Sequence, residues 1–415
     1  MKKRRIVVTG MGALCSVGND IDEMWAALKA GKSGVGHITQ IDTSGQGVKI
    51  AAEVKNFDPG KHMDEKEARK MARFSIFACA AAKMALDMAG LKTGDFDPVR
   101  AATIIGVGVG GLDEMEKGSN IIQERGPMAV HPLIIPRIIS NEAPGNVAMM
   151  FGLQGPCLCT TTACASGTDA ITVAADAIRS GRVDLAITGG SEAAISPLAV
   201  AGFTRLTALT TAFNDQPEKA SRPFDKNRSG FVMGEGAGIL VLEEYEHAKR
   251  RGANIICEYA GGAMTCDAYH LTSPAPDGNG AVRAFNLCLE DAGLKPEDVD
   301  YLNAHGTSTP VNDPTETSAI KQVFGAHAQK LHISSTKSMM GHTLGAAGGL
   351  EAVVSILAMR DGFIPPTINL DEPGEGCDLN YTPNVGKAAE VNVVMSDSLG
   401  FGGHNGVVCF KKFKE

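Results

Sequence analysis

The sequence predicts an α/β fold in which a mainly parallel sheet is covered by helices on both faces. Short β-branched runs alternate with helical stretches along the chain, and these runs are continuously apolar. Apolar strands separated by helices are typical of a parallel sheet buried on both sides. The 49 glycines indicate many tight turns between strands and helices and close helix packing.

The first elements follow this alternation. A strand is expected in "RRIVVTGMG" (4–12) and a helix in "DEMWAALKAG" (22–31). The alanine-rich stretch from Lys66 to Met88 predicts a long helix. Two further segments predict strands: "AATIIGVGVGG" (101–111), which ends in a turn, and "DLAITGG" (184–190).

The second part of the chain continues the pattern after "GILVLEEYEHAKRRG" (238–252). A break is expected near Arg250–Asn254, where a helix ends before a new strand. We therefore divide the chain into an N-terminal half, residues 1–253, and a C-terminal half, residues 254–415. Later strands and a second long helix are expected at 254–262, 299–306, 331–338 and 343–360.

Composition and charge exclude several classes of function. Of 415 residues, 44% are hydrophobic and 21% charged, an ordinary globular profile. The net charge of −8, without a basic domain, argues against nucleic-acid binding. No run of about 18 apolar residues predicts a membrane span, and "MKKRRIVVTGMGA" predicts a first strand, not a signal peptide. Ten cysteines without an export signal predict free thiols in a cytoplasmic protein.

Two glycine-rich turns are similar to the fingerprint of dinucleotide-binding folds. "VVTGMGALCSVG" lacks the third glycine at its place. "IIGVGVGG" contains Gly106, Gly108 and Gly111, but no clear helix follows it directly. We interpret these glycines as backbone turns at strand ends and expect no nicotinamide cofactor.

Cys164 lies at a predicted junction between a strand and a helix. "CLCTTTA" is strand-like, and "ASGTDAITVAADAIRSG" places four residues on one apolar helical stripe: Ile171, Ala174, Ala175 and Ile178. Small neighbours allow a sharp turn of the kind that exposes the serine of nucleophile elbows. The helix N-terminus favours a thiolate, and its N–H groups suit a developing oxyanion.

Two other interpretations of this cysteine stay open from the residues alone. Free cysteines are usually small buried hydrophobes, so Cys164 could simply fill the core. It could also ligate a metal with Cys157 and Cys159, although the usual zinc spacings are absent. The choice among nucleophile, core residue and metal ligand depends on motifs further along the chain.

Two histidines follow predicted strands in loops of unusual composition. "VDYLNAHGTSTPVNDPTE" ends a strand at His305 and continues through small hydroxyl residues. "SSTKSMMGHTLGAAGGLEA" passes Lys337 and reaches His342 before a glycine- and alanine-rich helix. A glycine-rich turn, "SDSLGFGGHNGVVCF", surrounds Phe401 after another strand. A single histidine here would more often be structural, but two at strand ends lie where α/β folds build their sites.

Together these motifs resemble those of the β-ketoacyl-acyl-carrier-protein synthases, the condensing enzymes of fatty-acid synthesis. "TTACASG", "NAHGTSTP", "STKSMMGHTLGAAGGLEA" and "GFGGHN" occur in the family's order, and "SRPFDKNRSGFVMGEGAGILVLEE" (221–244) resembles its central signature. The similarity covers essentially the whole chain and favours the type II members. It implies a thiolase-like five-layered α/β/α/β/α fold made of two similar halves.

The resemblance also implies a two-step reaction. Cys164 would take an acyl group from an acyl carrier protein, with the backbone N–H groups of Cys164 and Phe401 as the oxyanion hole. Malonyl carrier protein would then lose carbon dioxide, and its carbanion would attack the acyl-cysteine to give a 3-oxoacyl product. Neutral His305 and His342 would donate N–H bonds to the malonyl thioester oxygen.

By the same resemblance, Lys337 would hold His342 through a network with Glu351. Asp313 and Glu316 match acidic positions that support the site, although "NDPTET" is equally a helix-capping sequence. The remaining matches are Val109, Phe203 and the gating Phe401 at the acyl pocket, and Thr307 and Thr309 at the pantetheine arm.

The implied partner is an acyl carrier protein loaded with an acyl or malonyl group, and the implied assembly is a homodimer. No metal or organic cofactor is expected, because the phosphopantetheine arrives on the carrier. Since carrier and enzyme are both acidic, docking needs a local basic patch. Lys66, Arg69 and Lys70 match the family's docking helix, and Arg205 is a further candidate for the docking surface. The alternative for them is an ordinary solvated helix face.

Three other functions remain beside fatty-acid elongation. The chain could be a standalone ketosynthase of a polyketide pathway. It could be a non-catalytic partner subunit, such as a chain-length factor, but intact Cys164, His305 and His342 argue against this. A thiolase acting on coenzyme A esters is disfavoured, because thiolases use a second cysteine where this chain has His342.

Overall fold

The computed structural model describes residues 4–415, in which ten strands form one large sheet. Five strands come from the first half: β1 (Ile6–Cys15), β4 (Ala101–Gly106), β5 (Cys157–Thr160), β6 (Leu185–Glu192) and β7 (Gly236–Glu244). Five come from the second half: β8 (Cys257–Cys266), β9 (Tyr301–Asn303), β10 (His332–Ser334), β13 (Val393–Gly400) and β14 (His404–Lys411).

The strand order β10-β9-β13-β14-β8-β1-β7-β6-β4-β5 is the same in each half when read outward from the β1–β8 junction. The expectation of two similar halves is therefore confirmed. The boundary expected between residues 253 and 254 lies in the connection from α9 (Tyr245–Arg250) to β8.

The sheet is mixed, which corrects the expected mainly parallel arrangement. β4 is parallel to β5 and β6, and β9 is parallel to β10 and β13. The central strands β1, β7, β8 and β14 are antiparallel to all of their neighbours. Every residue of β1 and β7 is buried. Their continuous apolar pattern thus reports burial on both faces and carries no information about strand direction.

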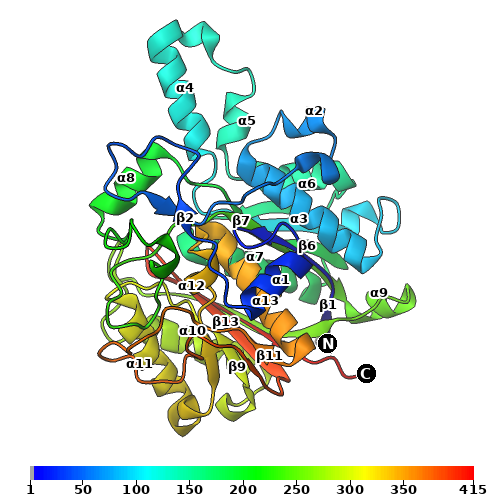
Figure 1. Cartoon of the computed structure of the whole chain (residues 1–415). Coiled ribbons are helices and arrows are strands. Elements are labelled where there is room, and N and C mark those ends of the chain that lie inside the picture. Colours follow the sequence, from blue (N-terminus) through cyan, green and yellow to red (C-terminus); the bar gives the residue numbers. More distant parts are fainter. Residues whose placement is uncertain (1–3) are drawn as a thin grey trace.

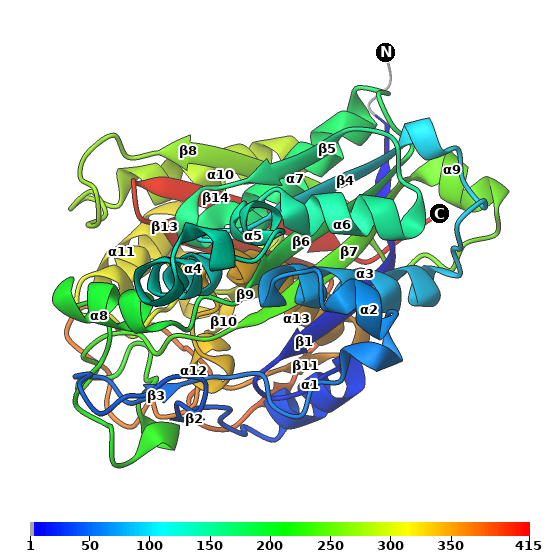
Figure 2. The same ribbon diagram turned by 90° about the horizontal axis from the view of Figure 1, so that it is seen from above.

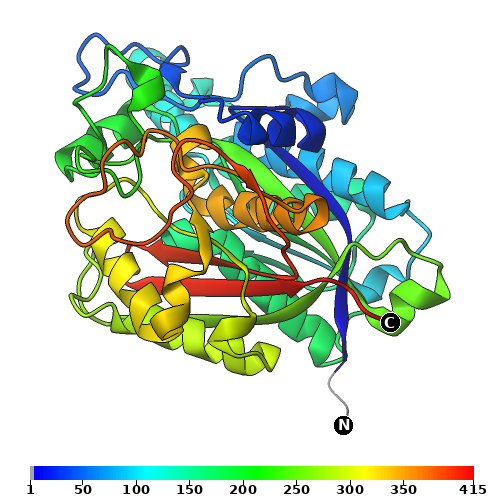
Figure 3. The same cartoon turned by 60° about the horizontal axis from the view of Figure 1, so that its bottom comes forward.

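Helices complete five layers around this sheet (Figure 1). α7 (Ser166–Arg179) and α13 (Ala347–Asp361) lie between the two halves of the sheet and contact both. Figure 3 shows α13, in orange, beside the red strands β13 and β14. The outer layers are α3 (Arg73–Ala89) with α6 (Glu142–Phe151), and α10 (Asn279–Ala292) with α11 (Asn312–Phe324). The thiolase-like layer order is therefore confirmed.

The long helix expected over residues 66–88 is two separate helices. α2 (Glu65–Ala68) ends after one turn, and four residues separate it from the start of α3. The guanidinium of Arg137 donates to the carbonyl oxygens of Arg69 and Lys70. These two residues lie in the break between the helices, so a residue distant in the chain satisfies their carbonyl oxygens.

α4 (Leu112–Arg125) and α5 (Ile134–Ile138) project from the layered body as a helical arm (Figures 1 and 2). α4 begins directly after the glycine-rich turn that follows β4, where the sequence shows no clear helix. Only Gly118 is buried within α4. The helix consequently has no apolar face buried against the layered body.

The remaining elements are short: α1 (Ile21–Lys29), α8 (Pro197–Arg205), α12 (Lys337–Met340), β2 (Gly36–His37), β3 (Ile50–Ala51), β11 (Phe363–Ile364) and β12 (Lys387–Ala388). Short 3-10 turns join several of them. Among residues 4–415, no helix has the length and apolar character needed to cross a membrane.

A similar turn precedes the central helix of each half. Ala163, with φ +51°, opens the 3-10 turn before α7, and Leu344, with φ +50°, opens the one before α13. Side chains other than glycine seldom occupy this region, so both turns are strained in the same way. Cys164 and Gly345 consequently occupy equivalent positions. A Cβ at Gly345 would lie 2.2 Å from the backbone nitrogen of Gly108, so only glycine fits there.

Candidate active site

Cys164 lies at the tip of the turn between β5 and α7, as the small residues around it predict. The left-handed conformation of Ala163 bends the chain sharply just before it. The cysteine is only 8% exposed, yet it lines a cavity of about 270 Å³. That cavity gives the sulfur its access to solvent, so the residue does more than fill the core.

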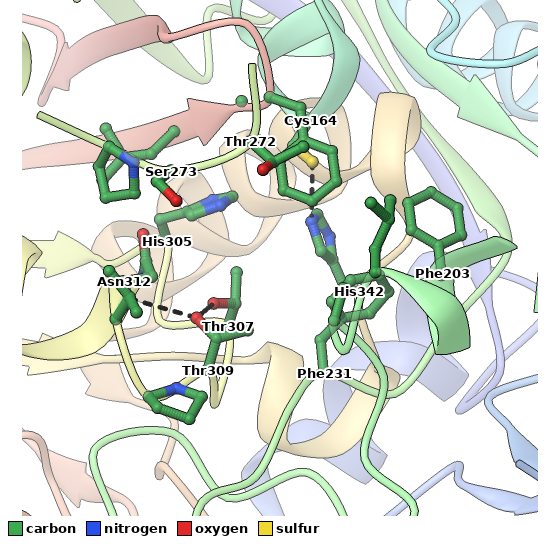
Figure 4. Close-up of a pocket in the computed structure, with 18 of the residues that line it drawn as sticks. Cys164, Phe203, Phe231, Thr272, Ser273, His305, Thr307, Thr309, Asn312 and His342 are labelled. Carbon is green, nitrogen blue, oxygen red and sulfur yellow. Dashed lines mark hydrogen bonds between the residues drawn. The ribbon is translucent and has the colours of Figure 1, made fainter. Parts of the chain in front are cut away.

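His342 lies directly against this sulfur, with 3.0 Å between its Nε2 and Sγ of Cys164 (Figure 4). The N–H of Leu344 donates to Nδ1 at 3.3 Å, which leaves the ring proton on Nε2. Burial and the charge of Lys337 hold the pKa of His342 well below its usual value. The ring is therefore neutral and presents an N–H to the sulfur.

The ring of His305 stands at 88° to that of His342, with 5.3 Å between the two centroids. Nζ of Lys337 lies 3.4 Å from Nδ1 of His305, an arrangement that leaves the ring proton on Nε2. Burial, Lys337 and His342 hold the pKa of His305 well below its usual value. Two neutral imidazoles thus line one cavity with the cysteine (Figure 4).

Lys337 is buried and forms an ion pair with the carboxylate of Glu351. Its contact with an imidazole is to His305, which corrects the expectation that it holds His342. Lys337 is the first residue of α12, just after β10, and β10 pairs with β9, the strand that leads to His305. The pairing of these two strands therefore decides which histidine the lysine meets.

The N–H of Phe401 donates to the sulfur of Cys164. Phe401 opens the turn between β13 and β14, where Gly402 and Gly403 have φ of +88° and +76°. Its ring lies 6.3 Å from that of Phe203, centroid to centroid. A backbone N–H beside the nucleophile is what an oxyanion hole requires.

Burial raises the pKa of the Cys164 thiol to about 11, while Lys337 and the Phe401 N–H act in the opposite direction. The turn at the start of α7 was expected to favour a thiolate. In this structure burial outweighs that effect, so the resting form at neutral pH is the thiol.

Asp313 and Glu316 are fully buried in the first turns of α11, which removes the alternative of a surface helix cap. Asp313 accepts the N–H of Phe224 at 2.8 Å. Glu316 accepts the N–H of Gly306, the residue after His305, also at 2.8 Å. Glu316 thereby holds the loop that carries the histidine.

Four of the predicted pocket and substrate residues line the cavity: Phe203, Phe401, Thr307 and Thr309. The two threonine hydroxyls lie 3.0 Å apart, and both threonines lie on the other side of His342 from Phe203 (Figure 4). Val109 does not line it and is 37% exposed, on the loop after β4.

The basic residues expected to dock a carrier lie on the surface, away from the sulfur. Lys66, Arg69, Lys70 and Arg205 are all exposed. Arg69 and Lys70 pair with carboxylates of their own helix turn, at 3.1 Å and 2.6 Å. Arg205 ends α8, next to Leu206 of the cavity lining. Their role stays a prediction.

Several residues of the site were not predicted. Phe231 and Asn312 line the cavity, and Asp397 accepts the N–H of His305 at 3.3 Å. Asn312 and Asp397 lie inside the polar segments "PVNDPTE" and "SDSLG", so a polar residue beside a motif was the available signal. Within the described residues, no group of three or more histidine, cysteine or carboxylate side chains is arranged to hold a metal ion.

A thiolase-like fold that brings one cysteine and two neutral histidines to a common cavity defines the class of condensing enzymes. The Beta-ketoacyl synthase N-terminal domain matches residues 3–248, and the Beta-ketoacyl synthase C-terminal domain matches residues 256–371. The chain belongs to the beta-ketoacyl synthase family.

Similar curated proteins carry one name. The "3-oxoacyl-[acyl-carrier-protein] synthase 2" of Synechocystis is 49% identical over 414 residues, which cover 100% of this chain and 99% of the relative. The protein of that name from Coxiella burnetii is 48% identical over 412 residues, 99% of each chain.

Solved structures show the same fold. A beta-ketoacyl synthase from Burkholderia phymatum has a TM-score of 0.92 at 36% identity, covering 99% of this chain and 100% of that one. With the same TM-score and coverage, the AntDE ketosynthase, solved with the type II polyketide acyl-carrier protein AntF, is 34% identical. The ishigamide ketosynthase/chain length factor is 39% identical, with the same TM-score and coverage.

Proposed function

We propose that this protein catalyses the decarboxylative condensation of malonyl-acyl carrier protein with an enzyme-bound acyl group, giving 3-oxoacyl-acyl carrier protein in fatty-acid elongation. The observation that carries the proposal is the meeting of three chain segments at one sulfur. His342 Nε2 lies 3.0 Å from Sγ of Cys164, the second imidazole stands 5.3 Å from the first, and the Phe401 N–H donates to the same sulfur.

In the first step, Sγ of Cys164 attacks the thioester carbonyl of the acyl carrier. A new carbon–sulfur bond forms, the bond to the pantetheine sulfur breaks, and the proton of the cysteine ends on the released pantetheine thiol. The tetrahedral oxyanion is held by the backbone N–H groups of Phe401 and Cys164. Because the cysteine rests as a thiol, proton loss accompanies the attack.

In the second step, the malonyl thioester loses carbon dioxide. The electron pair of the broken carbon–carbon bond is delocalised onto the thioester oxygen, which becomes the oxygen of an enolate. The Nε2–H groups of His305 and His342 donate to this oxygen. The carbanion carbon then attacks the acyl carbonyl on Cys164, and the cysteine sulfur leaves as a thiolate. One proton taken up from water returns it to the resting thiol. Neutral imidazoles suit this role, and burial with Lys337 keeps both neutral.

The substrate supplies its own prosthetic arm, so the proposal needs no metal or organic cofactor. Thr307 and Thr309 meet the pantetheine, while Phe203 and Phe401 border the acyl end. The glycines after Phe401 allow its ring to swing.

Acyl carrier protein is the proposed partner, supported by the exposed basic residues of α2 and Arg205 and by the carrier bound in the AntDE:AntF complex. A homodimer is proposed from the free edge of β5, the last strand of the sheet. Exposed apolar residues cluster on this strand and the neighbouring arm and helix: Met115, Ile122, Met128, Leu133, Ile135, Ile139, Met149 and Leu158. A cytoplasmic location is supported by ten cysteines that are all free thiols.

Acyl transfer and decarboxylation, measured separately, test the function. Mass spectrometry should find an acyl group from acyl carrier protein on Cys164, absent in Cys164→Ala and retained in the control Cys159→Ala. His305→Ala and His342→Ala should accept the acyl group but release carbon dioxide from malonyl carrier about 100- to 1000-fold more slowly. Full decarboxylation in either variant would remove that histidine from its role.

A wild-type chain that accepts no acyl group would indicate a chain-length-factor-like subunit. A wild-type chain that extends only polyketide starters would indicate a polyketide ketosynthase.

A further inference from the structure

Glu192, the last residue of β6, is a fully buried carboxylate whose partners are backbone N–H groups. Its oxygens accept from three consecutive residues, Gly108 at 2.8 Å, Val109 at 3.1 Å and Gly110 at 3.0 Å. A fourth N–H comes from Gly345 at 3.2 Å, across the molecule. Within residues 4–415, no lysine, arginine or histidine forms an ion pair with it.

Consecutive N–H groups at a glycine-rich turn after a strand normally receive the oxygens of an anion from outside. Here the chain supplies its own anion, which fills the turn that is similar to a dinucleotide fingerprint. Both contacting segments are built closely around it. A Cβ at either Gly108 or Gly345 would lie 2.8 Å from Oε2 of Glu192.

The Gly345 contact leads to the reacting groups. Gly345 follows Leu344, whose strained φ of +50° sets the direction of its N–H, and that N–H donates to Nδ1 of His342. His342 in turn presents Nε2 to Cys164. The carboxylate therefore holds the turn that fixes both the ring orientation and the tautomer of His342.

We propose that Glu192 is a positioning residue: it orients His342 through Gly345 and Leu344, and so controls decarboxylation more than acyl transfer. The distinction follows from the contacts. Acyl transfer needs the sulfur and the Phe401 N–H, and Glu192 contacts neither of them. The charge of Glu192 acts on the sulfur only from a distance, where it raises the pKa of the Cys164 thiol, so removing that charge does not slow acyl transfer. Decarboxylation, in contrast, needs the N–H of His342 to be held in one orientation. The inference rests on the proposed function for the identity of the two half-reactions.

A carboxylate is required at this position, because four donors converge on two oxygens. In Glu192→Gln, one oxygen becomes an NH₂ group that faces N–H groups instead of accepting from them. Burial raises the pKa of Glu192 to about 7, and the four backbone N–H groups oppose that rise by stabilising the charged form. The amide therefore loosens the turn without changing the volume of the side chain.

The test measures both half-reactions in Glu192→Gln. We expect release of carbon dioxide from malonyl carrier to fall about 10- to 100-fold, as for a small misplacement of a catalytic group. The rate of acyl transfer to Cys164 should stay within about threefold of the wild-type rate. The KM for malonyl carrier should change much less than kcat does. An equal fall in both half-reactions, or no change in decarboxylation, would overturn the proposal.

Glu53→Gln is the matched control, because Glu53 is also buried and accepts N–H groups, from Thr39 and Gln40, in a loop that does not line the cavity. It should leave the ratio of the two half-reactions at the wild-type value. If Glu192→Gln fails to fold, Glu192→Asp, which keeps the charge but shortens its reach, should show the same altered ratio. A wild-type protein that performs neither half-reaction would refute the proposed function itself, a result distinct from an unaltered ratio in active variants.

Discussion

Lys337 and His305 are joined by a contact of 3.4 Å between Nζ and Nδ1, and the same ammonium is paired with the buried carboxylate of Glu351. Removing one member of a buried ion pair leaves the other charge without compensation, at a cost of about 3–5 kcal/mol. We therefore expect Lys337→Met to lower the free energy of unfolding by about that amount.

The loss should depend on pH. Burial raises the pKa of Glu351 to about 7, and Lys337 acts to lower it. Without the lysine this pKa rises further, so the buried carboxyl protonates and the loss is smaller at pH 6 than at pH 8. Denaturant unfolding at both pH values measures this. The double variant Lys337→Met/Glu351→Gln should recover part of the stability; a double variant as unstable as Lys337→Met would show that the unpaired charge is not the cause.

The pKa of Cys164 predicts its reactivity toward alkylating agents. Because the thiolate is the reactive form and the pKa is about 11, the alkylation rate with iodoacetamide should rise about tenfold for each pH unit from 7 to 10. Lys337 lowers this pKa, so Lys337→Met should slow alkylation at pH 8. Peptide mapping, with Cys164→Ala as background, follows the site. A plateau below pH 8 would contradict the assignment of a resting thiol.

Carrier docking is expected to depend on the basic residues of α2. Arg69→Glu should raise the KM for acyl carrier protein several-fold with little change in kcat, because a charge at the rim of an interface governs encounter. The difference from wild type should shrink as salt rises. Lys83→Glu, which reverses a charge on α3, is the control. Equal KM values for the two variants would refute docking at α2.

The open edge of the sheet at β5 is where we expect two copies of the chain to meet in a dimer. Leu158 lies in β5 and is 50% exposed, so a lysine there should protect the edge and shift a dimer toward monomer in light scattering. Leu287, 46% exposed on α10, provides the control Leu287→Lys, which should stay dimeric. A dimeric Leu158→Lys protein would place the interface elsewhere.

The reacting groups were predictable because each lies in a short motif within a connection that follows a strand, directly or, for His342, after the short helix α12. Cys164, His305 and His342 are of this kind. The partner of Lys337 was not predictable, because it depends on the pairing of β9 with β10, which no local pattern encodes. Glu192 had no signal at all, since a single acid among small residues resembles an ordinary strand end.

Some elements of the fold could not be predicted from the sequence, for similar reasons. The direction of β1 and β7 relative to their neighbours could not be predicted. A strand buried on both faces is apolar throughout, whether its neighbours are parallel or antiparallel. The carbonyl oxygens in the break between α2 and α3 accept from Arg137, a partner that is distant in the chain and has no local signal. α4 was not predicted, because a helix that projects from the body buries no stripe of apolar side chains.

The repeated turn limits how many reaction centres one polypeptide can hold. The two halves place Cys164 and Gly345 at corresponding points of two turns that contact each other, and the second point has no room for even one carbon. A second nucleophilic side chain therefore does not fit at the position equivalent to Cys164. Each subunit should be charged with a single acyl group, however many copies of it assemble.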